Sequence, residues 1–229
     1  MKLRVIFLIL IFCFITVSVQ ARVPGRTYYD RQNNQFIYII RAGDTFFNIS
    51  QTFKIDLDRL KGLNYNLNPR SLQVGDQVLI SINEDLNYHL TTSSDTLWEI
   101  SQTSKLTMDD IIAYNRLENP NKLTVNEIIL LPSLVAENNN IKVLEFYQKN
   151  GLVYVTGVAR VFEATVNYAF ETETGEVLME GFTTATTGGP EWGKYIFKSY
   201  IPARANYLSV FHISAKDGSR LYEIRLELR

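Results

Sequence analysis

The sequence predicts two small α+β units followed by an all-β sandwich. Two observations carry this prediction: an internal repeat with a spacing of 51 residues, and a change from helical to period-two hydrophobic patterning near residue 140. The repeat matches residues 44–80 with residues 95–131 without a gap. A repeat of this length indicates one structural unit built twice in tandem.

Thirteen aligned positions of the two copies are identical. They are Asp44 with Asp95, Thr45 with Thr96, Ile49 with Ile100, Ser50 with Ser101, Gln51 with Gln102, Thr52 with Thr103, Lys54 with Lys105, Asp58 with Asp109, Asn64 with Asn115, Asn68 with Asn119, Pro69 with Pro120, Leu72 with Leu123 and Val74 with Val125. Many other pairs exchange one apolar residue for another, as do Leu60 and Ile111. The same fold is therefore expected for both copies.

The chain begins with the pattern of a secretory signal peptide. Lys2 and Arg4 precede an apolar run, and small or aliphatic residues stand at the cleavage-determining positions before Arg22. The run of about 13 apolar residues is shorter than the roughly 20 of a membrane-spanning helix. Residues 1–21 are therefore expected to be removed, leaving no stable membrane span; a membrane anchor or a lipid attached to Cys13, the one cysteine, are the alternatives.

The first copy reads as strand, helix, helix, strand after a flexible leader at residues 22–35. Residues 36–40 predict a strand that ends near Gly43, where glycine permits a tight turn. Asp44 or Thr45 is expected to cap the first helix.

The remaining elements follow from capping and breaking signals. In the second copy Thr96 and Glu99 have capping-box spacing, and the second helix is expected to open at Asp56 in one copy and at Thr107 in the other. An Asn-Pro pair then ends each helical region, because proline cannot continue a helix. Antiparallel pairing of the two strands, with both helices on one face, would give units over 36–82 and 87–133.

Residues 134–140, with three consecutive asparagines, are expected to be a linker. Beyond them, apolar and polar residues alternate, and turn signals separate about seven short runs over residues 141–229. The alternating apolar positions include Val166, Tyr168, Phe170, Tyr222, Ile224, Leu226 and Leu228. About 90 residues of short strands with frequent turns are typical of an immunoglobulin-like β-sandwich.

The two copies resemble the lysin motif (LysM). Residues 38–46 and 72–80 carry the resemblance in the first copy, and residues 94–98 with the second Asn-Pro pair carry it in the second. Asn126 departs from the pattern, since the family usually has glycine there. The resemblance implies non-catalytic binding of glycans that contain N-acetylglucosamine, namely peptidoglycan or chitin-like polymers, with no cofactor.

The resemblance also implies the binding residues, which form a shallow groove between two loops of each copy. The groove residues are Gly43, Asp44, Thr45, Phe46, Asn66, Leu67, Asn68 and Pro69 in the first copy, and Ser94, Asp95, Thr96, Leu97, Leu117, Glu118, Asn119 and Pro120 in the second. Two linked grooves on one polymer gain affinity through effective concentration. The alternative is that the aspartates and threonines only cap helices.

The last part of the chain is similar to the immunoglobulin-like domain of bacterial spore germination proteins. The similarity lies in residues 157–164, 189–193 and 214–219. It implies a cell-envelope or spore context, and an interaction or spacing module that meets an envelope or spore protein through residues 141–229.

Composition and residue patterns argue against other classes of function. The formal net charge is −1 and no basic stripe is present, so nucleic acid is not an expected partner. Six glutamates could supply a hydrolytic pair, but most of them are read as solvated strand or turn residues: Glu163, Glu171, Glu173, Glu176, Glu180 and Glu191. His89 and His212 are too isolated for a metal site or triad, and Trp98 and Trp192 are expected to pack, unless Trp192 is exposed.

The leading hypothesis is a secreted, non-catalytic protein of the cell wall or spore envelope that binds glycan in sporulation or germination. Two alternatives remain. One is a peptidoglycan hydrolase or an accessory subunit of one, and the other is a structural envelope or spore-coat assembly factor without glycan binding.

Overall fold

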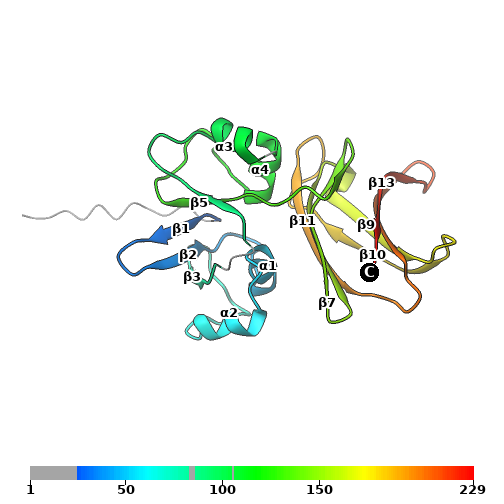
Figure 1. Ribbon diagram of the computed structural model, residues 1–229, viewed down its shortest axis with the longest axis horizontal. Coiled ribbons are helices and arrows are strands. Elements are labelled where there is room, and N and C mark those ends of the chain that lie inside the picture. Colours follow the sequence, from blue (N-terminus) through cyan, green and yellow to red (C-terminus); the bar gives the residue numbers. More distant parts are fainter. Residues whose placement is uncertain (1–24, 83–85, 105) are drawn as a thin grey trace, which may run out of the picture.

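The computed structural model describes residues 25–82, 86–104 and 106–229, so the expected signal peptide lies outside the described residues. The two repeats lie side by side at one end of the molecule and the sandwich lies at the other (Figure 1). Among the helices in this part of the chain, none is long and apolar enough to cross a bilayer.

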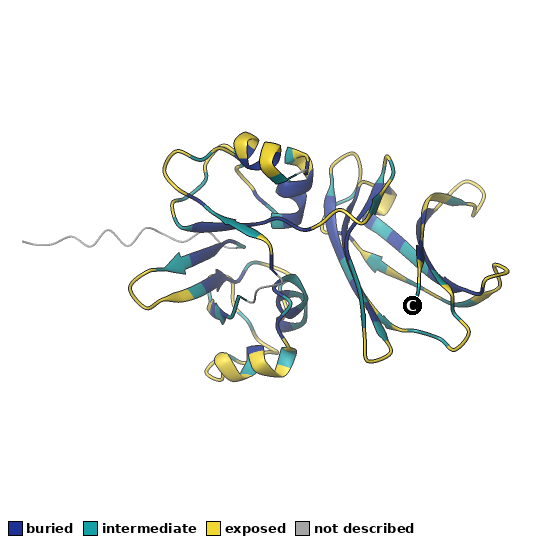
Figure 2. Ribbon diagram, in the orientation of Figure 1, coloured by how far each residue is buried: buried dark blue, intermediate teal, exposed yellow. Residues whose placement is uncertain are grey.

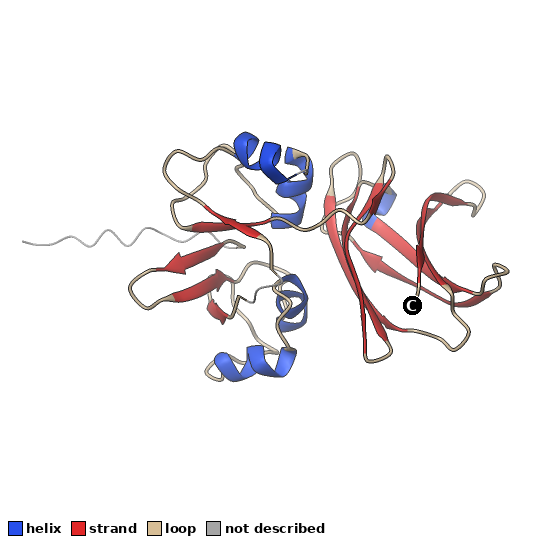
Figure 3. Cartoon of the chain, in the orientation of Figure 1, coloured by secondary structure: helices blue, strands red, loops and turns tan. Residues whose placement is uncertain are grey.

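Each repeat has the expected order of strand, helix, helix, strand. The first repeat consists of β2 (Gln35–Ile39), α1 (Phe46–Thr52), α2 (Leu57–Leu63) and β3 (Gln77–Ile80). The second consists of β4 (Tyr88–Leu90), α3 (Leu97–Ser104), α4 (Met108–Asn115) and β5 (Glu127–Leu130). Within each repeat the two strands pair antiparallel, as predicted. Figure 3 shows the helices of the two repeats on opposite sides of the strands.

Part of the expected leader is a strand, so the prediction of a flexible segment is wrong for residues 27–30. Strand β1 (Thr27–Asp30) pairs antiparallel with β2 and with β5. The result is one sheet of five strands in the order β3-β2-β1-β5-β4, which joins the two repeats. Tyr28 is buried against Ile37 and Ile39, and the pairing of β1 with the distant strand β5 has no counterpart in the local pattern of the leader.

The helix caps confirm the sequence-based assignments. Thr45, not Asp44, caps α1, because its hydroxyl accepts from the amide of Asn48 at 3.1 Å. Asp56 caps α2. Thr107 forms a capping box with the residue three places on, which satisfies two otherwise unpaired amides at the start of α4.

One hydrophobic core runs through both repeats and reaches the sandwich. It contains Phe46, Ile49 and Leu60 of the first repeat and their counterparts in the second, and it extends to Leu144 and Val158. In Figure 2 the buried residues continue from the repeats to the adjoining strands of the sandwich. Burial of this continuous apolar surface favours a fixed arrangement of the three domains.

The C-terminal part forms two four-stranded sheets, as expected for a sandwich. Their orders are β10-β9-β12-β13 and β11-β8-β7-β6. The strands are β6 (Ala136–Glu137), β7 (Ile141–Lys149), β8 (Leu152–Ala159), β9 (Thr165–Glu171), β10 (Val177–Thr184), β11 (Gly193–Tyr200), β12 (Tyr207–Ile213) and β13 (Arg220–Glu227), with a short helical turn at Phe162–Ala164. Strand β6 corrects the linker prediction, because residues 136–137 pair with β7.

The period-two pattern holds except at a bulge. Val166, Phe170, Ile224 and Leu226 are buried between the sheets as predicted. Tyr222 is 41% exposed, contrary to its place in the alternating pattern. The register between β12 and β13 shifts beside it and its φ is +56°, and such an irregularity turns the preceding side chains to the other face.

Candidate functional site

The opening loop of the first repeat is built around a buried carboxylate. The Tyr38 hydroxyl donates to Asp44 Oδ2 at 2.6 Å, and the Arg41 amide donates to the same oxygen at 2.9 Å. Gly43 has a φ of +80°, a conformation that favours glycine. Asp44 therefore fixes the loop from beneath, with 4% of its side chain exposed, while the backbone at Gly43 lies at the surface.

The second repeat uses the same construction with a different partner. Asp95 Oδ2 lies 2.7 Å from His89 Nε2 and accepts from the Thr92 amide at 2.7 Å. His89 aligns with Tyr38, so both repeats place a ring with a polar atom under the loop. The hydrogen bond with His89, followed by that with Thr92, lowers the pKa of Asp95. His89 therefore has a structural role, as the sequence predicted: it holds the Asp95 carboxylate beneath the loop.

In each repeat the segment that carries the second set of predicted groove residues is preceded by an asparagine to which the sequence analysis gave no role. Asn64 donates to the carbonyls of Leu60 and Leu79 at 2.9 and 2.8 Å, and accepts from the Leu79 amide at 2.7 Å. Asn115 makes the same three bonds in the second repeat. Each asparagine ties the second helix to the last strand, which explains its identity in the two copies.

Two further asparagines shape these segments. Asn68 Oδ1 accepts from the amide two residues on at 3.0 Å, and Asn119 does the same at 3.2 Å.

Asn126, which stands in place of the family's glycine, has a φ of +64°, against +96° for the aligned Gly75. Asparagine tolerates this left-handed conformation better than most residues, so the departure from the pattern leaves the turn intact.

The predicted groove residues fall into three groups by exposure. Gly43, Thr45, Asn66, Asn68, Pro69, Ser94, Thr96, Glu118 and Asn119 are exposed, and Asp44, Leu67, Asp95 and Pro120 are partly buried. Phe46, Leu97 and Leu117 are buried at 2%, 3% and 7%. The side chains of these three belong to the core, so only their backbone can line a groove.

The predicted groove segments of the two repeats contact each other, which the sequence did not reveal. Arg116 of the second repeat donates to Asp44 Oδ1 at 2.8 Å, and Arg41 of the first donates to the Arg116 carbonyl at 2.9 Å. Arg26 donates to the Asn119 carbonyl at 3.3 Å and forms an ion pair with buried Glu127 at 2.6 Å. The contacts of Arg41 and Asp44 join the opening loop of the first repeat to the end of α4 in the second, and Arg26 adds contacts from the segment before β1.

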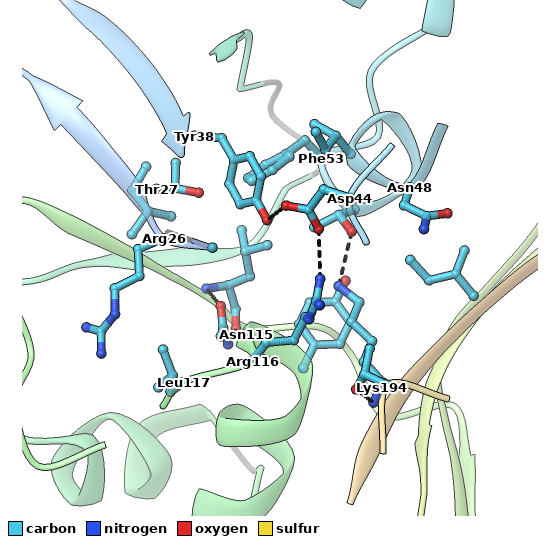
Figure 4. A pocket seen from close by; sticks show the side chains of 18 of the residues that line it. Arg26, Thr27, Tyr38, Asp44, Asn48, Phe53, Asn115, Arg116, Leu117 and Lys194 are labelled. Carbon is cyan, nitrogen blue, oxygen red and sulfur yellow. Dashed lines mark hydrogen bonds and ion pairs between the residues drawn. The ribbon is translucent and has the colours of Figure 1, made fainter. Parts of the chain in front are cut away.

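A cavity of about 230 Å³ lies behind these loops, where both repeats meet the sandwich. Figure 4 shows Tyr38 and Asp44 of the first repeat on one side of it, and Arg116 of the second repeat with Lys194 of β11 on the other. The Lys194 ammonium lies 3.1 Å from Thr52 Oγ1 and 3.8 Å from the centroid of the Tyr114 ring. Burial lowers the pKa of Lys194 to about 7.

The other residues that were candidates for catalysis, metal binding or packing lie as follows. Of the six glutamates, Glu171 is buried with Arg220 and Ser209, and the others are exposed. Across residues 25–82, 86–104 and 106–229, no cluster of three histidine, cysteine, aspartate or glutamate side chains could hold a metal ion. Trp192 is partly buried between two cations, but Trp98 is 60% exposed, so its expected packing is wrong.

Comparison with known proteins identifies the domains. Residues 38–81 and 89–132 each match the LysM domain, and residues 148–219 match the immunoglobulin-like domain of bacterial spore germination. The chain thus contains two LysM domains followed by an immunoglobulin-like domain of the spore germination type, as their residues predicted.

One similar curated protein is the secreted LysM effector ECP6 of Passalora fulva, which is 34% identical over 101 residues. The match covers 42% of this chain and 44% of that protein, so the chain spans less than half of the relative's length.

Two solved structures, both spore cortex-lytic enzymes called SleL, are also similar. The one from Bacillus megaterium is 28% identical with a TM-score of 0.23, and the match covers 45% of this chain and 24% of that one. The one from Bacillus cereus is 25% identical with the same TM-score of 0.23, over 42% and 22%.

Proposed function

We propose that this protein is a secreted, non-catalytic binder of glycans that contain N-acetylglucosamine, and that it acts at the cell wall or spore envelope. The main observation in its support is that both LysM repeats build their opening loop in the same way. In both repeats a carboxylate held from beneath leaves the polar backbone of the loop at the surface. An acetamido group offers one donor and one acceptor, which such a backbone can match.

The contact between the predicted groove segments supports binding of a polymer. Because Arg116 and Asp44 join the two repeats, the grooves have a fixed relative position. Two sites on a rigid body that match the spacing of a polymer gain affinity through effective concentration. The sandwich then serves as an interaction module toward an envelope or spore protein, an assignment supported by its match to the germination-type domain.

Co-sedimentation with insoluble peptidoglycan tests glycan binding. Asn66 and Ser94 are exposed, one in each groove, and tryptophan at either position should obstruct its groove. We expect Asn66→Trp and Ser94→Trp each to reduce the pelleted fraction, and the double variant to abolish it. Gln32→Trp, at an exposed turn outside both grooves, is the matched control. Pelleting of the double variant at the wild-type level would refute the proposal and favour the assembly factor.

The hydrolase alternative is decided by a separate measurement. A suspension of purified cell-wall or cortex sacculi should keep its turbidity when the pure protein is added, because binding alone breaks no glycosidic bond. A steady loss of turbidity would assign the protein to the enzymes instead.

A further inference from the structure

A second surface with the chemistry of a binding site lies on the sandwich, away from the LysM loops. On antiparallel neighbours, directly opposite residues share a face. Tyr147 of β7 is opposite Tyr154 of β8, which is opposite Lys198 of β11, and the next row contains Lys149, Leu152 and Tyr200. We call these two rows the tyrosine face: Tyr147, Lys149, Leu152, Tyr154, Lys198 and Tyr200.

The tyrosine face begins where the repeats cease to cover the sheet. At the other end of the same strands, Glu145 accepts from the Tyr114 hydroxyl at 3.0 Å and Lys194 reaches Thr52. These contacts dock the repeats on the sheet. Helix α1 then runs beside the tyrosine face, and a groove of about 620 Å³ lies between them. Its volume is within the range of roughly 300–1,000 Å³ that holds small ligands.

Tyrosine and phenylalanine side chains line the groove. The rings of Tyr147 and Tyr154 stack at a centroid distance of 4.7 Å and an interplanar angle of 8°. Tyr200 extends this surface and is 75% exposed, and Phe47 of α1 lines the opposite wall. The stack alone would stabilise the pairing of β7 and β8. An aromatic surface that continues to an exposed tyrosine is more than that role requires, and it indicates a binding surface.

The groove also has a positive charge that its own residues do not balance. Lys149 and Lys198 are exposed beside the tyrosines, whereas Lys54 is paired with Glu145 at 3.1 Å. Asp56 is the one carboxylate among the described residues that line the groove. The Lys198 ammonium lies 4.8 Å from the centroid of the Phe47 ring. A local excess of cations on a chain of formal charge −1 favours an anionic ligand.

We propose that the tyrosine face binds a saccharide that carries carboxylates. Tyrosine rings can cover the apolar faces of sugar rings, and the ammonium groups of Lys149 and Lys198 can pair with carboxylates at the rim of the groove. A neutral glycan would offer neither lysine a carboxylate. Since none of these residues belongs to the LysM loops, the site is independent of the two predicted grooves and adds a charge preference that they lack.

The test compares an acidic with a neutral saccharide by calorimetry on the purified full chain. An oligosaccharide of uronic acids without N-acetylglucosamine is the acidic probe, and chitohexaose is the neutral one. We expect Tyr154→Ser and Lys198→Glu each to weaken binding of the acidic probe by about fivefold or more, the effect of removing a strongly contacting side chain. Binding of chitohexaose, which reports on the LysM grooves, should stay within about twofold of wild type.

Matched controls lie elsewhere on the sandwich. Phe182→Ser changes a 70% exposed aromatic residue of β10, and Lys216→Glu changes an exposed lysine in a turn. Both should bind the acidic probe as the wild type does. Unchanged affinity for the acidic probe in Lys198→Glu, a surface variant that should not disturb folding, would overturn the proposal. An equal loss for both probes, or wild-type protein that does not bind the acidic one, would also overturn it.

Discussion

Lys194 is expected to make the stability of the protein depend on pH above neutrality. Its side chain is buried, with 5% of the residue exposed, and its neighbours are a threonine hydroxyl and the ring of Tyr114. Burial lowers the folded-state pKa from 10.5 to about 7, against the opposing effect of Glu145. Between these two values the unfolded chain holds a proton that the folded chain has released.

The sign and size of the effect follow from this difference. Because the unfolded state binds more protons in this window, the free energy of unfolding rises with pH, by at most about 1.4 kcal/mol per unit. From pH 7.5 to pH 9 the gain from Lys194 is about 2 kcal/mol. Tyr38, Tyr114 and Tyr195 have pKa values raised by burial, so their opposing effect begins only near pH 10, outside this range.

Urea denaturation at pH 7.5, 8.25 and 9, followed by tryptophan fluorescence, measures how the free energy of unfolding depends on pH. The wild type should gain about 2 kcal/mol relative to Lys194→Met across the range, since methionine fills a similar volume and does not titrate. Lys216→Met, which removes an exposed lysine, should follow the wild type. Parallel profiles for wild type and Lys194→Met would show that Lys194 keeps its proton in the folded protein and would refute the reasoning.

Three further predictions concern the scaffold of the grooves. Asn64→Ala should lower the free energy of unfolding by about 2–4 kcal/mol, because it leaves buried backbone groups of α2 and β3 without partners; Asn66→Ala, at an exposed position, should cost under about 0.5 kcal/mol in the same urea titration. Gly43→Ala should cost about 1 kcal/mol through backbone strain alone, since no atom lies within 4 Å of the added methyl group, and an unchanged urea midpoint would contradict this. Glu127→Gln should cost about 3 kcal/mol and speed amide exchange in β1, because it leaves Arg26 buried without its carboxylate; exchange unchanged in β1 would count against that role.

The sequence allowed correct prediction of features that depend on neighbours along the chain. Capping residues such as Thr45 and Thr107 act within one helical turn, so their spacing alone identifies the helix start. Repetition made these signals stronger, because a cap or turn that occurs twice at the same offset is unlikely to arise by chance. The period-two alternation of the sandwich is also local, and it failed only at the bulge beside Tyr222.

Contacts between distant segments were beyond such reasoning. Strand β1 exists because the leader pairs with two strands, one of them about 100 residues away, as the bond between Arg26 and Glu127 shows. The pairing of Arg116 with Asp44 likewise depends on how the repeats meet. Lys194 and Thr52 lie 142 positions apart, and no local pattern marks either as an interface residue.

Binding residues cannot all be assigned from a family motif position by position, as the burial of Phe46, Leu97 and Leu117 shows. These positions belong to the binding segments of the family but face the core, so they anchor the loops rather than present side chains. Asp44 and Asp95 are similar, since one oxygen of each is occupied by a loop amide and by the ring of a strand residue, Tyr38 or His89. The recognition surface is therefore expected to consist mainly of backbone.

Amide NMR during titration with chitotetraose tests this central claim most directly. The amides of Gly43 and Thr45 in the first repeat, and of Ser94 and Thr96 in the second, should shift in a saturable way, while those of the exposed turn at residues 215–218 should not. If the loop amides keep their positions at saturating sugar, or if the shifts occur only elsewhere, the LysM loops are not the glycan site and the proposed function is contradicted.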